Sequence, residues 1–240
     1  MEERTLVRLW TSADPLPGGR GTARFCLTEG RRAVVKKESR GGLAGHFLPD
    51  LFLLHGPFSR EREVAGHLKK SGLAPAILDR QFVRKGPLFA VFTLVENSEG
   101  ANSLVDLWKA GRLDASALTS AGLGVGRLHR AGVLHGDLNA GNLMITPVGE
   151  ALFLDLRHSK QLKRPPSAAS RRRNLLRLAR SLHKVRHTLD LEWPQDVWTI
   201  LSTGYAETWG EREPWLKEWA LRCMRGFPIR QLFWSDASEG

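Results

Sequence analysis

The chain has 240 residues, of which 42% are hydrophobic and 25% charged, a balance typical of globular proteins. Its 36 Lys and Arg exceed its 25 Asp and Glu, and the formal net charge of +11 favours polyanionic partners such as phosphorylated substrates, anionic lipid or nucleic acid. Two cysteines provide neither a disulfide framework nor a metal cluster, and no apolar run reaches the roughly 18 residues that cross a bilayer. Because the start of the chain also lacks the apolar core of a signal peptide, we expect a cytoplasmic protein.

The N-terminal part is predicted to consist of strands with one helix. Residues 23–27 (ARFCL) and 33–37 (AVVKK) are short β-like runs joined by turn residues. Residues 59–72 carry acidic residues in the first turn and end at a glycine, which indicates a helix with Ser59 as its N-cap. Residues 86–96 (GPLFAVFTLVE) form an apolar run that is continuous enough for a buried strand.

The second part is predicted to be mainly helical. Residues 114–132 repeat apolar side chains with the period of one helix face, beginning at an N-capping Asp114. Two short β-like pieces at 143–147 and 151–156 flank a turn, and the pattern from about residue 165 onwards is helical.

These elements predict an α+β fold with two lobes. The β-rich N-lobe is expected to span residues 1–97 and the helical C-lobe residues 98–240, with a hinge near residues 95–102.

The glycine-rich stretch PGGRGTARF at residues 17–25 is a candidate phosphate-binding turn. Its glycines would let backbone N–H groups approach phosphate oxygens, although glycine-rich hairpin turns are also common without any ligand. The candidate nucleotide-binding residues in this turn are Gly19, Arg20, Gly21 and Thr22.

Lys36 and a helical glutamate form a second candidate pair. Lys36 lies at the end of a predicted strand, from which it could reach nucleotide phosphates, but a lysine in this position is commonly just solvated. Glu61 is followed by apolar residues three, four and seven positions later, so it lies on the buried stripe of its helix, whereas Glu63 points well away from that stripe. We therefore choose Glu61 as the partner of Lys36. The alternative is that both glutamates only complement the helix dipole.

The strongest motif is HGDLNAGN at residues 135–142, followed by Asp155 thirteen residues after Asn142. Asp137 would orient the attacking hydroxyl and accept its proton, while Asn142 and Asp155 would hold Mg²⁺. The Asp-x4-Asn spacing, placed between a helix and a hairpin, resembles the catalytic and metal-binding segments of the protein-kinase-like fold. The alternative is a structural turn with incidental carboxylates. His135 is expected to pack and to hydrogen-bond the loop.

Three departures from the protein-kinase pattern narrow the class. Gly136 occupies the position where many protein kinases carry Arg, and Asn139 the position where Ser/Thr kinases carry Lys. After Asp155 the chain has neither a Phe-Gly pair nor an Ala-Pro-Glu segment for peptide docking. These differences indicate a kinase of small molecules or lipid-linked sugars.

Several segments, taken in order, resemble the bacterial lipopolysaccharide kinases, and above all the 3-deoxy-D-manno-octulosonic acid (Kdo) kinases. No single motif is specific, but their order is, and the resemblance runs from about residue 18 to 185. The segments are GGRGTARF (18–25), VVKKESRGGLAGHF (34–47), the Arg60–Glu61 pair, ENSEGANSLVDLW (96–108) and RNLLRLARSLHK (173–184).

The resemblance implies ATP and Mg²⁺ as cofactors and transfer of the γ-phosphate to a hydroxyl of the Kdo sugar on a lipid A precursor. It implies a peripheral protein on the cytoplasmic face of the bacterial inner membrane, in contact with an anionic surface, and no nucleic-acid partner. Members often read Asp-Phe-Asp where this chain has Asp155, Leu156 and Arg157. The missing second carboxylate leaves a second metal position and the acceptor contacts open.

Two surface patterns in the C-lobe have competing interpretations. The first is a basic stripe of one helix, which could meet anionic headgroups or could simply be solvated; it comprises Arg173, Arg177, Arg180 and Lys184. The second is the pair Trp215 and Trp219, one turn apart, for which core packing is favoured over a membrane interface.

Other functions also fit the sequence. A heptose kinase, another small-molecule kinase or an atypical protein kinase would share the fold, although the acid-lined pockets of aminoglycoside and choline kinases fit a chain of charge +11 poorly. A catalytically inactive kinase fold that binds polyanions is the alternative from a different class. The presence of all five candidate residues favours the enzyme, and the sequence does not fix the oligomeric state.

Overall fold

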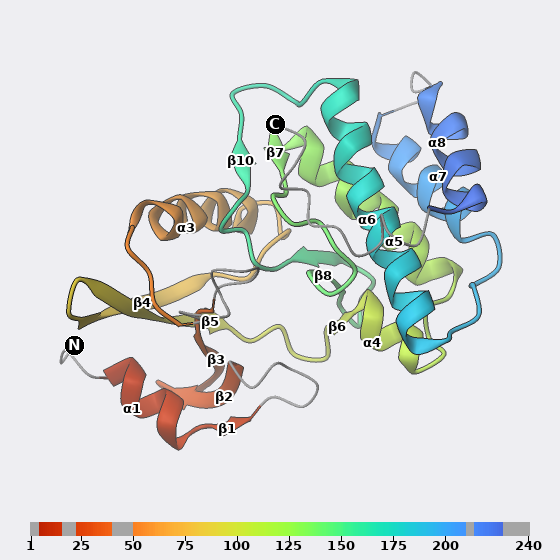
Figure 1. Ribbon diagram of the computed structural model, residues 1–240. Helices are drawn as coiled ribbons and strands as arrows, with labels where there is room; N and C mark the ends of the chain where they lie inside the picture. The colour runs from red at the N-terminus through yellow and green to blue at the C-terminus, as the bar shows by residue number, and fades with distance from the viewer. Residues whose placement is uncertain (1–4, 16–22, 40–49, 210–213, 228–240) are drawn as a thin grey trace. The chain divides into compact units, whose positions relative to one another are not determined.

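The structure is a computed structural model that describes residues 5–15, 23–39, 50–209 and 214–227 (Figure 1). It divides into two compact units. The strand-rich unit comprises Met1–Gly66 and Pro75–Ser98, and the helical unit comprises His67–Ala74 and Glu99–Gly240.

The strand-rich unit contains an antiparallel sheet of five strands in the order β1-β2-β3-β5-β4. The strands are β1 (Asp14–Pro15), β2 (Ala23–Thr28), β3 (Arg31–Lys37), β4 (Ile77–Lys85) and β5 (Leu88–Glu96). The predicted hairpin is confirmed, because β2 and β3 are joined by Glu29 and Gly30, both with positive φ as tight hairpin turns require. Strand β4 was not predicted, since its alternating pattern is weakened by charged residues.

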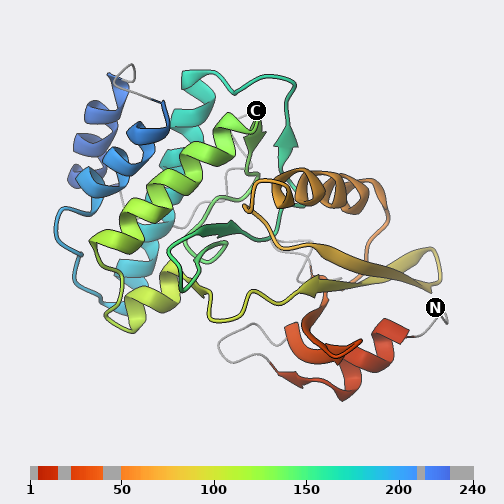
Figure 2. The ribbon, with the colours of Figure 1, turned by 180° about the vertical axis from the view of Figure 1, so that it is seen from behind.

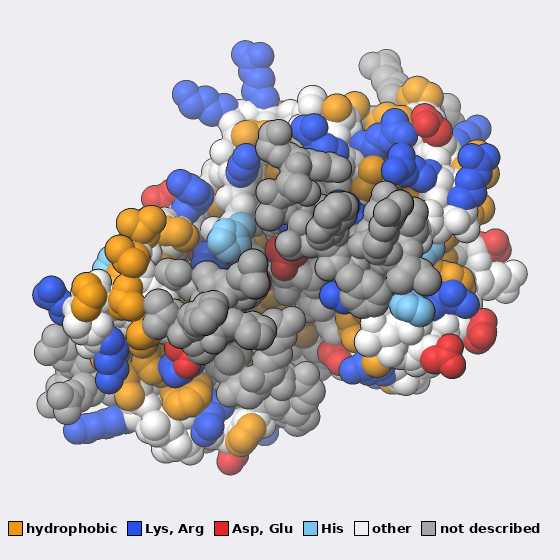
Figure 3. Space-filling model, in the orientation of Figure 1, with side chains coloured by type: hydrophobic (Ala, Val, Ile, Leu, Met, Phe, Trp, Pro, Cys, Tyr) orange, Lys and Arg blue, Asp and Glu red, His pale blue; other side chains and the backbone are white. Residues whose placement is uncertain are grey.

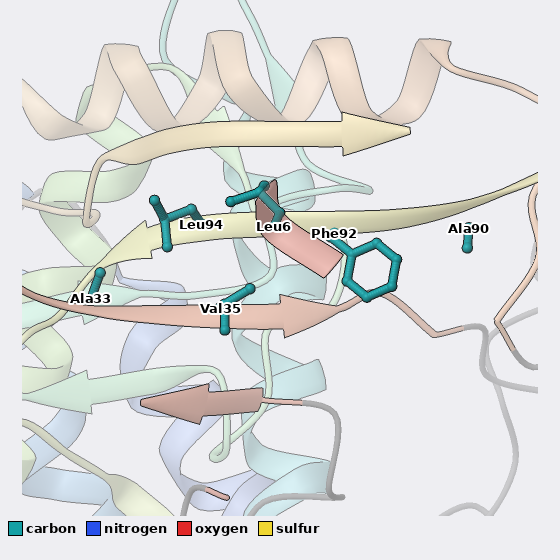
Figure 4. Close-up of a cluster of buried hydrophobic side chains, with 6 residues drawn as sticks. All are labelled: Leu6, Ala33, Val35, Ala90, Phe92 and Leu94. Carbon is teal, nitrogen blue, oxygen red and sulfur yellow. The ribbon is translucent and has the colours of Figure 1, made fainter. Parts of the chain in front are cut away.

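Helix α1 (Thr5–Ser12) packs on one face of this sheet, a helix that the sequence did not reveal. Figure 4 shows the six buried side chains of this layer, which come from α1, β3 and β5: Leu6, Ala33, Val35, Ala90, Phe92 and Leu94. Burying an aliphatic or aromatic side chain contributes about 1.5–3 kcal/mol, so this small cluster anchors α1 to the sheet.

Helix α3 (Gly56–Lys69) runs beside β4 and β5 in both ribbon views (Figures 1 and 2). Its contact with the sheet includes Phe58, which packs with Phe89 and Val91 of β5. The helix begins three residues before Ser59, so the N-cap prediction was wrong. The reason is Pro57, whose fixed φ and missing N–H suit the first turn of a helix.

The helical unit contains α4 (Leu104–Lys109), α5 (Ala115–Arg130), α6 (Ala168–Leu189), α7 (Val197–Trp209) and α8 (Trp215–Arg225) (Figures 1 and 2). Asp114 caps α5 as predicted, because its side chain accepts a bond from the N–H of Ala117 at 2.9 Å. Helices α5 and α7 approach backbone to backbone: a Cβ on Gly122 would collide with Leu201, and one on Gly204 with Thr119.

In the helical unit, the core packing favoured over a membrane interface is confirmed for Trp219. Leu175, Leu178 and Leu182 form the buried stripe of α6, and Trp219 is fully buried in the core. Trp215 is partly buried against Tyr205 at a ring-centroid distance of 6.0 Å. Among the described residues, no helix combines the length and apolar character that a bilayer span would require.

Short strands complete the helical unit and hold its loops. Strands β6 (Asn102–Ser103), β8 (Leu143–Ile145) and β9 (Ala151–Phe153) form one antiparallel sheet. Strand β7 (Val133–Leu134) pairs with β10 (Lys160–Gln161) in another. With strands concentrated in one unit and helices in the other, the predicted α+β class is confirmed.

Candidate active site

The HGDLNAGN segment forms a loop between β7 and β8, with apolar side chains inward and Asp137 outward. Leu138 and Ala140 are fully buried, whereas the Asp137 side chain is 52% exposed. The Asn139 side-chain amide donates to the Asp137 carboxylate at 2.9 Å and thereby fixes its direction. The loop therefore presents one oriented carboxylate to solvent, which is the arrangement a general base requires.

His135 braces this loop from inside. Its Nδ1 accepts from the N–H of Asp137 at 3.1 Å, and its Nε2 is 2.9 Å from the carbonyl oxygen of Leu154. A carbonyl oxygen only accepts, so Nε2 carries the proton and the ring is neutral. Burial lowers the pKa of His135, which keeps the ring in this form. As expected, His135 packs and hydrogen-bonds the loop.

Asn142 is held by the turn that precedes it. The Asn139 Oδ1 atom accepts from the N–H groups of Gly141 at 2.9 Å and Asn142 at 3.0 Å, a typical asparagine-centred turn. The Asn142 Nδ2 atom donates to the backbone oxygen of Asp137 at 2.9 Å. Because Nδ2 is used in this bond, the Oδ1 atom of Asn142 is the one that can bind a cation.

The β8–β9 hairpin brings Asn142 and Asp155 to the same end of one sheet. Leu143 lies opposite Phe153, and the N–H of Leu154 donates to the oxygen of Asn142 at 2.9 Å. Asp155 has a φ of 54°, in the left-handed region that few residue types other than Gly, Asn and Asp adopt. The thirteen-residue separation in the sequence is thus closed by the hairpin, as predicted.

Helix α6 lines the loop with a polar stripe that the sequence did not reveal. Asn174 pairs with the His135 backbone, donating to its oxygen at 2.8 Å and accepting from its N–H at 3.2 Å. Ser181 accepts from the N–H of Ala140 at 3.0 Å. Between them Arg177 donates to the oxygen of Gly136 and lies 3.8 Å from the Asp137 carboxylate. The spacing 174, 177, 181 is that of one helix face, which is the signal that could have found it.

Arg177 therefore has a role different from the basic surface stripe to which its periodicity assigned it. Its side chain is 29% exposed and provides positive charge beside the outward carboxylate. Residues 136–142 of the loop include no Lys or Arg, so this positive charge comes from α6.

Gly136 is required by the chain that follows Asp155. A Cβ at this position would collide with the backbone of His158, so no larger residue fits. The segment is fixed here because the N–H of Gly136 donates to Ser159 at 3.3 Å, one residue before β10 pairs with β7. The departure from the protein-kinase pattern has a packing cause.

Arg157 also lies beside a candidate carboxylate. Its guanidinium is 3.5 Å from Asp155, with side-chain exposures of 11% and 35%. The site in the helical unit thus pairs each of its two carboxylates, Asp137 and Asp155, with an arginine. These four side chains together carry no net charge.

The residues of this unit suit one magnesium ion held together with phosphate. Mg²⁺ prefers oxygen ligands and is commonly bound by one or two carboxylates with substrate phosphates. Asn142 and Asp155 supply an amide and a carboxylate oxygen at one hairpin end. Within the described part of the chain, no group of three or more His, Cys, Asp or Glu residues is placed to hold a metal ion alone.

In the strand-rich unit, Lys36 and Glu61 come together as predicted. Their charged groups are 3.8 Å apart, and Glu61 is 3% exposed while Glu63 is exposed to solvent. Lys36 has a nearer carboxylate, however, in Glu38 at 3.1 Å. Glu61 likewise has a nearer cation, Arg80, at 2.6 Å.

Sequence reasoning missed Glu38 and Arg80. Both side chains are more than nine-tenths buried, but Glu38 directly follows β3 and Arg80 lies in β4 among other polar residues, so no local pattern marked either charge as buried. The predicted phosphate-binding residues lie outside the described part of the chain: Gly19, Arg20, Gly21 and Thr22.

A strand-rich unit carrying a lysine–glutamate ion pair, with a helical unit carrying an Asp-x4-Asn loop and a hairpin aspartate, defines a protein-kinase-like phosphotransferase. The comparison with family models then gives the family. The model described as the lipopolysaccharide kinase (Kdo/WaaP) family matches residues 14–205, and the chain belongs to this family.

Individual relatives agree with this assignment. The chain is 32% identical over 198 residues to a 3-deoxy-D-manno-octulosonic acid kinase of Stenotrophomonas maltophilia (strain K279a), covering 80% of this chain and 78% of the relative. It is 32% identical over 199 residues, with the same coverage, to the protein of that name from Xanthomonas campestris pv. campestris (strain B100). The resemblance found in the sequence is confirmed, and the chain is a phosphotransferase with an alcohol group as acceptor.

Proposed function

We propose that this enzyme transfers the γ-phosphate of ATP, with Mg²⁺, to a hydroxyl of a Kdo sugar on a lipid A precursor. The observation that carries the proposal is the loop that fixes Asp137 and Asn142 and, through the β8–β9 hairpin, Asp155. The Kdo acceptor is supported by the names of the relatives, which cover four-fifths of the chain.

Asp137 is the proposed catalytic residue. Its carboxylate would accept a hydrogen bond from the acceptor hydroxyl and take its proton as the oxygen attacks the γ-phosphorus. Asn139 holds the carboxylate in direction, and the Arg177 guanidinium lies 3.8 Å from it.

Asn142 and Asp155 are the proposed metal ligands. When bound, Mg²⁺ would offset the negative charge of the phosphates in the transition state. The two protein ligands contribute fixed oxygens, because the amide of Asn142 is oriented by Asp137 and Asp155 follows directly on the hairpin.

Lys36 is the proposed contact for the nucleotide phosphates, with Glu61 as a partner that holds it. Gly19, Arg20, Gly21 and Thr22 are proposed to contact the phosphates through the glycine-rich turn. In this proposal residues 1–97 form the nucleotide-binding lobe and residues 98–240 the lobe that binds the metal and the acceptor.

The enzyme is further proposed to work as a peripheral protein on the inner face of the bacterial inner membrane. Lys and Arg side chains gather over α6 and α8 on the face shown in Figure 3. Exposed basic residues of these helices include Arg173, Lys184, Arg222 and Arg225. Each basic residue near an anionic surface contributes about 1 kcal/mol, so several together would retain the protein there.

The direct test is transfer of radiolabelled γ-phosphate from ATP with Mg²⁺ to a Kdo-bearing lipid A precursor. We expect product with the wild type and none above background with Asp137→Ala. A precursor without Kdo should remain unlabelled, and a heptose-bearing acceptor tests the nearest alternative. If the heptose-bearing acceptor is labelled and the Kdo-bearing acceptor is not, heptose replaces Kdo as the proposed acceptor sugar. If the protein binds polyanions but neither transfers phosphate nor binds ATP with Mg²⁺, the interpretation as an inactive polyanion-binding fold replaces the interpretation as an enzyme.

A further inference from the structure

A row of polar side chains crosses three strands of the sheet in the strand-rich unit. Lys36 of β3 lies directly opposite Thr93 of β5, and Thr93 lies directly opposite Arg80 of β4. Residues directly opposite in an antiparallel pair point to the same face of the sheet. Glu38 joins this row two residues after Lys36, where its N–H bonds the oxygen of Val91 at 2.9 Å and extends the ladder.

These side chains and Glu61 of α3 form a closed ring of polar contacts. Lys36 is 3.1 Å from Glu38, which accepts from the Thr93 hydroxyl at 2.7 Å. Thr93 in turn accepts from Arg80 Nε at 3.1 Å. The ring then closes through Glu61, which lies 2.6 Å from Arg80 and 3.8 Å from Lys36.

The ring has no net charge and is nearly excluded from water. Two cations, Lys36 and Arg80, face two carboxylates, and Thr93 is fully buried while Glu38 and Glu61 are each 3% exposed. The Arg80 side chain is 4% exposed, whereas that of Lys36 is 25% exposed. Lys36 is thus the member of the ring that reaches towards solvent.

The two carboxylates do not hold Lys36 equally. Glu61 makes its short contact with Arg80, and its other oxygen is 3.8 Å from the Lys36 ammonium. Glu38 is closer to Lys36, and the Thr93 hydroxyl fixes the same Glu38 oxygen that Lys36 contacts. The position of the ammonium therefore depends more on Glu38 than on Glu61.

We propose that Glu38 is the principal positioning residue for Lys36, and that Arg80 and Thr93 hold the two carboxylates in place. This inference rests on the proposed function, in which Lys36 contacts the nucleotide phosphates. An ammonium group has three N–H donors, so binding by two carboxylates is compatible with a phosphate contact. Glu38 acts through Lys36 and touches no substrate.

The test compares the KM for ATP and kcat among isosteric variants of the ring. Glu38→Gln should raise the KM for ATP about ten-fold with kcat changed far less, because it removes one charged hydrogen bond from the lysine. Thr93→Val should give a smaller rise in the same direction, and Thr93→Ser, which keeps the hydroxyl, should behave as wild type. Glu61→Gln should raise KM less than Glu38→Gln.

Two controls separate positioning from folding. Glu61 is as buried as Glu38, so a general loss of buried charge would affect both variants alike. Glu63→Gln changes an exposed carboxylate of the same helix and should leave both kinetic constants unchanged. Thermal unfolding of each variant shows that the protein assayed is folded.

Lys36→Met separates the inference from the proposed function. If this variant leaves the KM for ATP unchanged, the nucleotide contact of Lys36 is wrong, and the inference falls with it. If Lys36→Met raises KM strongly while Glu38→Gln behaves like Glu63→Gln, or no worse than Glu61→Gln, the function stands and Glu38 is not the principal positioning residue.

Discussion

The two groups of candidate residues are held in opposite ways. In the strand-rich unit, Glu61 contacts both Lys36 and Arg80 side chain to side chain, within a ring that is largely buried. In the helical unit, Asp137 is 52% exposed, and the loop that carries it is fixed by bonds to backbone groups from His135 and Asn174. Charge balance determines geometry in the first group and backbone bracing in the second.

Because of this difference, a substitution at the site in the helical unit can change activity without changing stability. In the strand-rich unit, a substitution in the ring is expected to change both. Removing the exposed Asp137 carboxylate should leave the loop intact, since His135 and Asn174 brace the loop through its backbone atoms. Removing a charge from a buried ring leaves its partner uncompensated in a low-dielectric environment, which destabilises the fold by several kcal/mol. The predictions below test each half of this contrast.

The largest expected effect is a loss of turnover without a loss of stability. Asp137→Asn keeps the shape of the side chain and an oxygen that can accept from Asn139, but it cannot take a proton from the acceptor. We expect kcat to fall on the order of 10³-fold. The free energy of unfolding, measured in urea, should change by less than about 0.5 kcal/mol. A loss of several kcal/mol would show that the carboxylate also supports the fold.

The opposite result is expected in the ring. Arg80→Met removes a cation that is 4% exposed and leaves Glu61 without its nearest partner. We expect a loss of about 4 kcal/mol in the free energy of unfolding. The double variant Arg80→Met with Glu61→Gln should lose less than the sum of the single variants, because the stranded charge is removed as well. Additive losses would show that the ring is not coupled.

Much of the fold followed from local patterns. The β2–β3 hairpin, β5, α5 with its Asp114 cap and the β8–β9 hairpin all have strong local signals, namely turn residues, apolar periodicity and a capping side chain. The burial of Glu61 rather than Glu63 followed from helix geometry alone. The chemical roles of these residues stay predictions.

What the sequence did not reveal depends on pairing between distant segments. The row from Lys36 to Arg80 exists only in one register of three strands, and a shift of one residue would turn each side chain to the other face. Predicting the polar stripe on α6 would have required knowing where this helix lies along the loop, since that position brings Asn174 next to His135. Neither the register of the strands nor the position of α6 against the loop can be predicted from a local sequence pattern.

The smallest expected effect sharpens the contrast, because His129 supports the loop through Asn174 without any ion pair. Burial lowers the pKa of His129 to about 4, below the usual value of 6.5, while its ring contacts Tyr205 at 2.9 Å and Asn174 at 3.1 Å. As the pH falls below about 6.5, His129 becomes protonated in the unfolded chain but stays neutral in the folded protein. The free energy of unfolding therefore decreases towards acid pH. We expect the free energy of unfolding to be about 2 kcal/mol lower at pH 5 than at pH 7 because of this residue, with His135 adding in the same direction.

Urea unfolding at both pH values should show a smaller difference in His129→Gln, whereas His187→Gln, at an exposed position, should retain the wild-type difference. An unchanged difference in His129→Gln would assign the acid sensitivity to another group.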